Sequence, residues 1–184
     1  MRIITAPEHY EPSDKDITVF LAGGITNCPN WQKQVIDTLS NDKYYYEDNL
    51  DSLVLFNPRR ENFPIWDKNA AKEQIQWEYN MIEKCDIFSM YFPSSDSDQP
   101  ICMYELGRNI LRMQMRFPTD WDDRIVIGVE DGYKRRQDVL IQTELATHDI
   151  VWVNAQISGD ECLGYHIHDI YMAFKKRLIR DAKY

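Results

Sequence analysis

Runs of apolar residues alternate along the chain with segments whose apolar positions recur every three or four residues. The first apolar run, DITVFLAGG at 16–24, is rich in β-branched and aromatic residues and ends in glycines, so it predicts a strand. In the next segment, at 31–40, the apolar residues Trp31, Val35 and Leu39 are spaced as on one face of a helix. The start of the chain therefore predicts a strand, a loop and a helix.

The same alternation continues along the chain. Further strands are predicted at 52–58, 86–92, 124–130 and 149–154. Further helices are predicted at 68–85, 100–115, 137–146 and 161–181. Strands that alternate with helices are typical of a parallel sheet covered on both faces. We therefore predict an α/β fold with a five-stranded, parallel, doubly wound sheet of the flavodoxin-like type.

A single domain is expected from length and composition. The chain has 184 residues, of which 43% are hydrophobic, and this is enough to bury one sizeable core. Residues 1–15 precede the first predicted strand, and we expect them to form an N-terminal extension. Residues 16–184 are expected to form one α/β domain, because no internal repeat or break in composition divides them.

The charge of the chain argues against nucleic acid as a partner. With 30 acidic and 21 basic side chains the formal charge is −9, which would repel a phosphate backbone. No apolar stretch approaches the length needed to cross a bilayer, and the first residues lack the apolar core of a signal peptide. We therefore expect a cytoplasmic protein that does not bind membranes.

The cysteines and histidines do not predict a metal site. The four cysteines are scattered, without a CxxC pair, so reduced thiols are expected rather than disulfides or a zinc site. His166 and His168 lie two residues apart in a segment with a helical pattern, where this spacing turns side chains away from each other.

Glu105 follows four largely apolar residues in QPICMYELGRN at 99–109, near the start of a predicted helix. In a flavodoxin-like sheet, ligands bind outside the carboxyl ends of the strands, where the loops after the first three predicted strands would meet. Two interpretations are open. Glu105 faces this crevice and takes part in chemistry, or it faces water and is simply favoured by the positive end of the helix dipole.

Four short motifs resemble the nucleoside 2-deoxyribosyltransferase family, particularly its deoxyribosyltransferase-like branch. The motifs are FLAGGI at 20–25, NPRR at 57–60, QIQWE at 74–78 and YELG at 104–107, and the similarity extends from residue 16 to about residue 145. The resemblance implies that Glu105 is a nucleophile that carries 2-deoxyribose between nucleobases as a covalent ester. It also implies small-molecule partners, a nucleoside or nucleotide and a free base, no cofactor and a homo-oligomer.

The resemblance assigns further roles with alternatives left open. Glu78 falls where the family has an aspartate near the nucleoside, and it either contacts the base and shuttles its proton or is an ordinary exposed helix residue. Phe20 replaces a tyrosine that hydrogen-bonds the nucleophile in many members. Asp98, followed by Gln99, stands one position out of register with an acid of the family.

The remaining candidates have both a binding and a structural interpretation. Arg59 and Arg60 either clamp a phosphate or anchor loops, and Trp31 or Trp66 either stacks on a base or belongs to the core. Asp138 is expected to add a polar contact across a subunit boundary. The complete set of predicted substrate-binding residues is Gly23, Gly24, Trp31, Arg59, Arg60, Trp66, Asp98, Gln99 and Asp138.

Three functions remain open from the sequence. The first is transfer of 2-deoxyribose between bases through Glu105. The second is hydrolysis of the N-glycosidic bond of a nucleoside or its 5′-monophosphate with the same glutamate and water as the acceptor. The third is a non-catalytic nucleotide-binding protein that keeps the fold without the chemistry.

Overall fold

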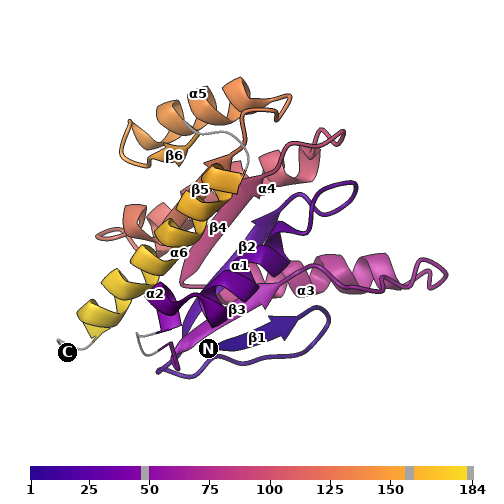
Figure 1. The fold of residues 1–184 in the computed structure, drawn as a ribbon, viewed down its shortest axis with the longest axis horizontal. Helices are drawn as coiled ribbons and strands as arrows, with labels where there is room; N and C mark the ends of the chain where they lie inside the picture. The colour runs from indigo at the N-terminus through magenta and orange to yellow at the C-terminus, as the bar shows by residue number, and fades with distance from the viewer. Residues whose placement is uncertain (47–49, 156–159, 182–184) are drawn as a thin grey trace.

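A computed structural model describes residues 1–46, 50–155 and 160–181 of the chain. Six parallel strands form one sheet in the order β1-β3-β2-β4-β5-β6 (Figure 1). The strands are β1 (Arg2–Thr5), β2 (Ile17–Gly23), β3 (Leu53–Asn57), β4 (Ile87–Phe92), β5 (Ile125–Val129) and β6 (Val153–Asn154). The helices are α1 (Trp31–Asn41), α2 (Lys43–Tyr46), α3 (Ala70–Lys84), α4 (Pro100–Arg116), the short 3₁₀ helix η1 (Asp122–Arg124), α5 (Arg136–Thr147) and α6 (Asp160–Asp181).

The sheet is flavodoxin-like, as the sequence predicted, but it has six strands instead of five. The additional strand β1 lies within the segment 1–15, and it pairs with β3 from Arg2 opposite Val54 to Thr5 opposite Asn57. An ion pair of 2.6 Å between Arg2 and Asp16 holds it in place. A four-residue edge strand offers too short an apolar run to be recognised in the sequence.

The last predicted strand, 149–154, is reduced to Val153–Asn154. His148 and Asp149 both have positive φ, of 50° and 62°, so the chain turns there before it joins β6. The other predicted strands and helices agree with the structure to within two residues at each end.

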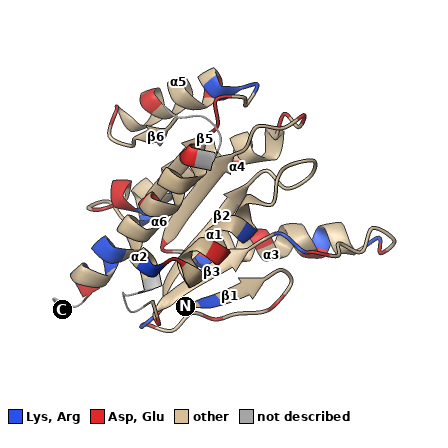
Figure 2. Cartoon of the chain, in the orientation of Figure 1, with Lys and Arg blue, Asp and Glu red and all other residues tan. Residues whose placement is uncertain are grey.

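Helices cover both faces of the sheet, and the side chains of each central strand alternate between the two cores that result. On β2, Phe20 belongs to the core shared with α3, α4 and α5, and Leu21 belongs to the core shared with α1 and α6. Among the six strands, only β1 contains a charged residue, Arg2. Figure 2 shows the other charged residues on helices and loops.

The final helix packs on its own sheet. Its apolar side contributes Ile167, Ile170, Tyr171 and Phe174 to the core below α1, so this face is not available for contacts between subunits. No helix in the described ranges is long and apolar enough to cross a membrane.

The order of the strands places a topological switch at β2, which has β3 on one side and β4 on the other. The chain continues from β2 to β3 on one side and then crosses to β4 on the other side of β2. The loops after these three strands therefore lead away from one another at the carboxyl ends of the strands. This is where ligands bind in open α/β sheets.

Candidate active site

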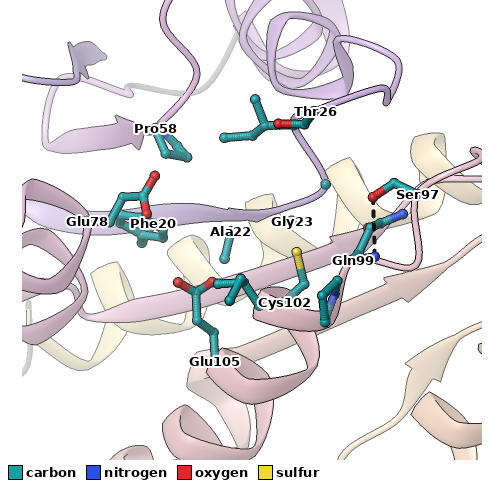
Figure 3. Close-up of a pocket in the computed structure, with 14 residues that line it drawn as sticks. Phe20, Ala22, Gly23, Thr26, Pro58, Glu78, Ser97, Gln99, Cys102 and Glu105 are labelled. Atoms are coloured by element: carbon teal, nitrogen blue, oxygen red, sulfur yellow. Dashed lines mark hydrogen bonds between the residues drawn. The ribbon is translucent and has the colours of Figure 1, made fainter. Parts of the chain in front are cut away.

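A cavity of about 280 Å³ opens at the carboxyl end of β2, between α3 and α4 (Figure 3). Phe20 and Ala22 of β2 form its floor, and the loops after β2, β3 and β4 form its walls. Fourteen residues line it: Phe20, Ala22, Gly23, Gly24, Ile25, Thr26, Pro58, Glu78, Ser97, Gln99, Pro100, Ile101, Cys102 and Glu105. The predicted crevice is therefore present, and its floor is apolar.

Glu105 lies in the second turn of α4 and directs its carboxylate into this cavity (Figure 3). The next residue, Leu106, faces the opposite side and belongs to the core. Burial raises the pKa of Glu105 to about 7, and the negative charge of Glu78 adds to this, while Arg108 opposes it. No described residue donates a hydrogen bond to the carboxylate. Glu105 therefore faces the crevice rather than bulk water.

Glu78 reaches the same cavity from the third turn of α3 (Figure 3). Burial raises its pKa, while a hydrogen bond from Gln74 and the positive charge of Arg60 lower it. The bond from Gln74 Nε2 to Glu78 Oε1 is 2.7 Å long. Two acids on different helices thus share one poorly solvated cavity, which is an arrangement typical of acid–base pairs in active sites.

Cys102 is the other ionisable side chain in the lining. Burial raises the pKa of its thiol to about 12, and the neighbouring Glu105 carboxylate adds to the increase. The thiol is therefore protonated at neutral pH and a poor nucleophile. The other two ionisable side chains among the described residues of the lining are Glu78 and Glu105.

The two glycines after β2 bring backbone close to the cavity. Gly23 has a φ of +149°, and a Cβ atom there would lie 2.2 Å from the carbonyl oxygen of Tyr91. A Cβ atom on Gly24 would lie 2.5 Å from Cys28 Sγ and 2.6 Å from Gln99 Oε1. Gly23 therefore requires glycine, whereas a side chain at Gly24 would first have to displace the side chains of Cys28 and Gln99.

Arg59 contacts the loop between β2 and α1. Its Nη2 donates to the carbonyl oxygens of Gly24, Ile25 and Pro29 at 2.8 to 3.2 Å, and its Nε donates to Gln32. These bonds use the guanidinium to hold the loop between β2 and α1. These contacts agree with the interpretation of Arg59 as a residue that anchors loops.

Arg60 also lies outside the lining of the cavity. Its side chain is 9% exposed, and its Nη2 contacts Glu73 at 2.7 Å. The guanidinium lies over the ring of Phe63 at 5.7 Å. Arg60 acts on the site through its charge, which lowers the pKa of Glu78.

Neither tryptophan lies in the wall of the cavity. Trp31 is 1% exposed, its ring packs against Tyr91, and its indole nitrogen donates to the carbonyl of Gly24. A ring with almost no exposed surface cannot stack on a base, so the stacking prediction for Trp31 is wrong. Trp66 is 79% exposed in the segment before α3, beyond the lining of the cavity.

Gln99 lines the cavity, whereas Asp98 and Asp138 do not. Gln99 has a φ of 46° and donates from Nε2 to the carbonyl of Pro93, while its Oε1 is buried without a partner among the described residues. Asp98 and Asp138 line a separate groove of about 610 Å³ between α4 and α5. Asp138 pairs there with Arg135 at 3.5 Å.

The comparison with family models agrees with this geometry. A family described as nucleoside 2-deoxyribosyltransferase like matches residues 16–117, which is more than half of the chain. The chain belongs to this family. The matched region runs from β2 to α4 and contains every residue that lines the cavity. The comparison with curated proteins gives no match.

Within this nucleoside 2-deoxyribosyltransferase-like chain, the sequence did not single out Pro58, Ser97, Thr26 or Cys102 as parts of the site. Three of these have small side chains on loops, whose positions no periodicity predicts. Gln74 was also missed, although its spacing of four residues from Glu78 on a helix is a readable signal for a side-chain pair.

Proposed function

We propose that the protein transfers 2-deoxyribose between nucleobases, with Glu105 as the nucleophile and Glu78 as the acid and base. The observation that carries the proposal is the placement of both carboxyl groups in one cavity at the switch point of the sheet. Family membership supports the same class of reaction.

In the first step, a Glu105 oxygen attacks the anomeric carbon of the nucleoside and the bond from this carbon to the base nitrogen breaks. The electron pair of that bond leaves with the base, which takes a proton from Glu78. The transition state has positive charge on the sugar, and the nearby carboxylate stabilises it. The products of this step are a glycosyl ester on Glu105 and a free base.

In the second step, a nitrogen of the incoming base attacks the anomeric carbon and the ester bond to Glu105 breaks. The incoming base loses a proton to Glu78, which restores both carboxyl groups to their starting states. Two displacements at one carbon retain its configuration. If water replaces the incoming base, the same residues carry out hydrolysis.

The donor is proposed to be an uncharged nucleoside rather than its 5′-monophosphate. None of the described residues that line the cavity is lysine, arginine or histidine, and two of them are acids. The nearby Arg59 is engaged by carbonyl oxygens of the loop after β2. Arg60 and Arg108 act on the two carboxyl groups from outside the lining, so a phosphate dianion placed beside these carboxylates would be repelled.

The test uses purified protein, 2′-deoxyadenosine or 2′-deoxyinosine as donor, and free cytosine as acceptor. Formation of deoxycytidine by the wild type, but not by Glu105→Gln, would support transfer. Glu144→Gln, at an exposed position on α5, is the matched control and should keep full activity. Free base without a new nucleoside would instead identify a hydrolase. Reaction of the 5′-monophosphate in preference to the nucleoside would contradict the donor assignment.

Absence of any product would point to a protein that keeps the fold and pocket without the chemistry. Binding of the nucleosides, measured by calorimetry, distinguishes this outcome from an inactive preparation. A complex that forms with wild type and with Glu105→Gln, yet gives no product, would establish a binding protein.

We propose a homo-oligomer on the basis of the outer faces of α3 and α4. Large apolar side chains on these two helices are exposed: Ile75, Tyr79, Ile101, Tyr104, Leu111 and Met115. Exposed apolar side chains gathered on one side of a protein are typical of interaction surfaces. Sedimentation should show an assembly that Leu111→Glu disrupts, and a wild-type monomer at micromolar concentration would contradict it.

A further inference from the structure

Gln74 lies one helical turn before Glu78 on α3 and contacts it directly. Its Nε2 is 2.7 Å from Glu78 Oε1 and also 2.7 Å from the carbonyl oxygen of Pro58, a residue that lines the cavity. An amide nitrogen carries two hydrogens, so these two bonds use both of them. Gln74 thereby connects the acid on α3 to the loop after β3.

The orientation of the Gln74 amide follows from these two neighbours. The Pro58 carbonyl can only accept a hydrogen bond, so the amide must present its nitrogen on that side. The oxygen Oε1 then points the other way, where it is buried without a hydrogen-bond partner among the described residues. A buried acceptor without a partner is unfavourable for folding. The amide therefore makes two bonds through its nitrogen and leaves its own oxygen unpaired.

The contact distinguishes the two oxygens of Glu78. Because Oε1 accepts a hydrogen bond from Gln74, the proton of neutral Glu78 sits on Oε2. That second oxygen has no partner among the described residues, and it is therefore the one available to a ligand. The bond also fixes the rotation of the carboxyl group, which would otherwise vary in a flexible glutamate side chain.

We propose that Gln74 is a positioning residue for Glu78. It holds the Glu78 carboxyl group so that the second oxygen, Oε2, exchanges the proton with the leaving and incoming bases. The proposal rests on the proposed transfer reaction for its kinetic consequences. The contact that it describes exists in the free protein, so it is also testable without any reaction.

The kinetic test is Gln74→Met, which keeps the length of the side chain and removes the amide. We expect kcat to fall about tenfold and KM to change less than about twofold, because the lost contact orients a proton donor and does not bind substrate. The high-pH limb of the rate profile should move to higher pH. Loss of a hydrogen bond that favours the charged form raises the pKa of Glu78.

A double-mutant cycle separates positioning from a merely structural role. In a Glu78→Gln background, Gln74→Met should cause no further loss of kcat, since Gln74 acts through the Glu78 carboxyl group. An equal loss in both backgrounds would overturn the proposal. The matched control is Gln76→Met, an exposed glutamine on the same helix, which should change neither kcat nor the profile.

A second measurement follows the carboxyl carbon of Glu78 by NMR as pH is varied. The titration midpoint should rise in Gln74→Met and stay constant in Gln76→Met. If no reaction is found but the midpoint rises, the proposed function fails while the role of Gln74 stands. If the midpoint does not move, the role of Gln74 is overturned, whatever the enzyme catalyses.

Thermal unfolding accompanies each variant. Gln74→Met removes a buried oxygen without a partner but also removes the donor to the Pro58 carbonyl oxygen, so these two effects oppose each other and its unfolding temperature should lie close to that of the wild type. If Gln74→Met does not fold, Gln74→Leu serves for the same comparisons. A clear loss of stability in both variants, with an unchanged Glu78 midpoint in whichever folds, would assign Gln74 to packing and overturn the proposal.

Discussion

The indole nitrogen of Trp31 donates a hydrogen bond to the carbonyl oxygen of Gly24 over 3.1 Å. The same oxygen accepts a second bond from Arg59 Nη2 at 3.2 Å. A tryptophan on α1 and an arginine after β3 therefore hold one loop residue in the wall of the cavity. The shape of the site depends on side chains that do not face the ligand.

Replacement of Trp31 by phenylalanine should lower both stability and activity. The variant keeps an aromatic ring in the core and loses the hydrogen bond to Gly24, so we expect the free energy of unfolding to fall by about 1–2 kcal/mol. Activity should fall because the loop after β2 is held less firmly. Urea unfolding and steady-state kinetics check both effects. Trp66→Phe, at an exposed position, is the control and should leave stability unchanged.

Two glycine-to-alanine substitutions should have opposite effects on stability. Gly23→Ala places a Cβ atom 2.2 Å from a backbone oxygen at a φ of +149°, and we expect a loss of about 2–4 kcal/mol. Gly107 lies inside α4, and a Cβ atom there meets nothing within 4 Å. Gly107→Ala should therefore raise stability by about 0.5–1 kcal/mol. Equal unfolding free energies for the two variants would contradict the packing described at Gly23.

The rate of the proposed reaction should depend on pH in a bell-shaped manner. Burial and the charge of Glu78 raise the pKa of Glu105 to about 7, and burial also raises the pKa of Glu78. The reaction needs one proton on this pair of carboxyl groups. Activity should therefore fall as pH rises through about 7 and the last proton leaves, and fall again in acid when both groups are protonated.

The pH profile of kcat/KM between about pH 4 and pH 9 checks this expectation. In Glu78→Gln the limb near pH 7 should disappear, because that limb reports the loss of the proton shared with Glu78. A wild-type rate that is constant across pH 7 would show that the two carboxyl groups are not coupled in this way.

The stability of the protein should change with pH through Glu105. Its pKa in the folded protein, about 7, lies above the ordinary value of 4.5, so the folded state holds a proton that the unfolded state releases. This stabilises the protein below pH 4.5, and the contribution is lost as pH rises through 7. At high pH the wild type carries a buried charge that Glu105→Gln lacks.

We therefore expect Glu105→Gln to gain stability over the wild type between about pH 4 and pH 8, by on the order of 2 kcal/mol. Denaturant unfolding at both pH values measures the difference. Glu144→Gln, at an exposed position, should show no comparable gain. A difference between wild type and Glu105→Gln that does not vary with pH would indicate that the Glu105 carboxylate is well solvated.

The sequence by itself determined the order of strands and helices and the place of Glu105 near the start of a helix. These features are local, because burial of one face of an element leaves its period in the spacing of apolar residues. The short motifs that carry the family resemblance also lie within single elements and the loops beside them. Strand β1 was not predicted, because four residues are too few to show a recurring pattern of apolar positions.

Only the tertiary structure decided which side chains meet at the site. Arg59 and Trp31 were both candidates for ligand contacts, and the fold directs both to the carbonyl oxygen of Gly24 instead. Glu78 and Glu105 lie on different helices, and their shared cavity exists because α3 and α4 cover the same face of β2. Hydrogen bonding and desolvation depend on such distant neighbours, and the order of residues within one helix does not contain them.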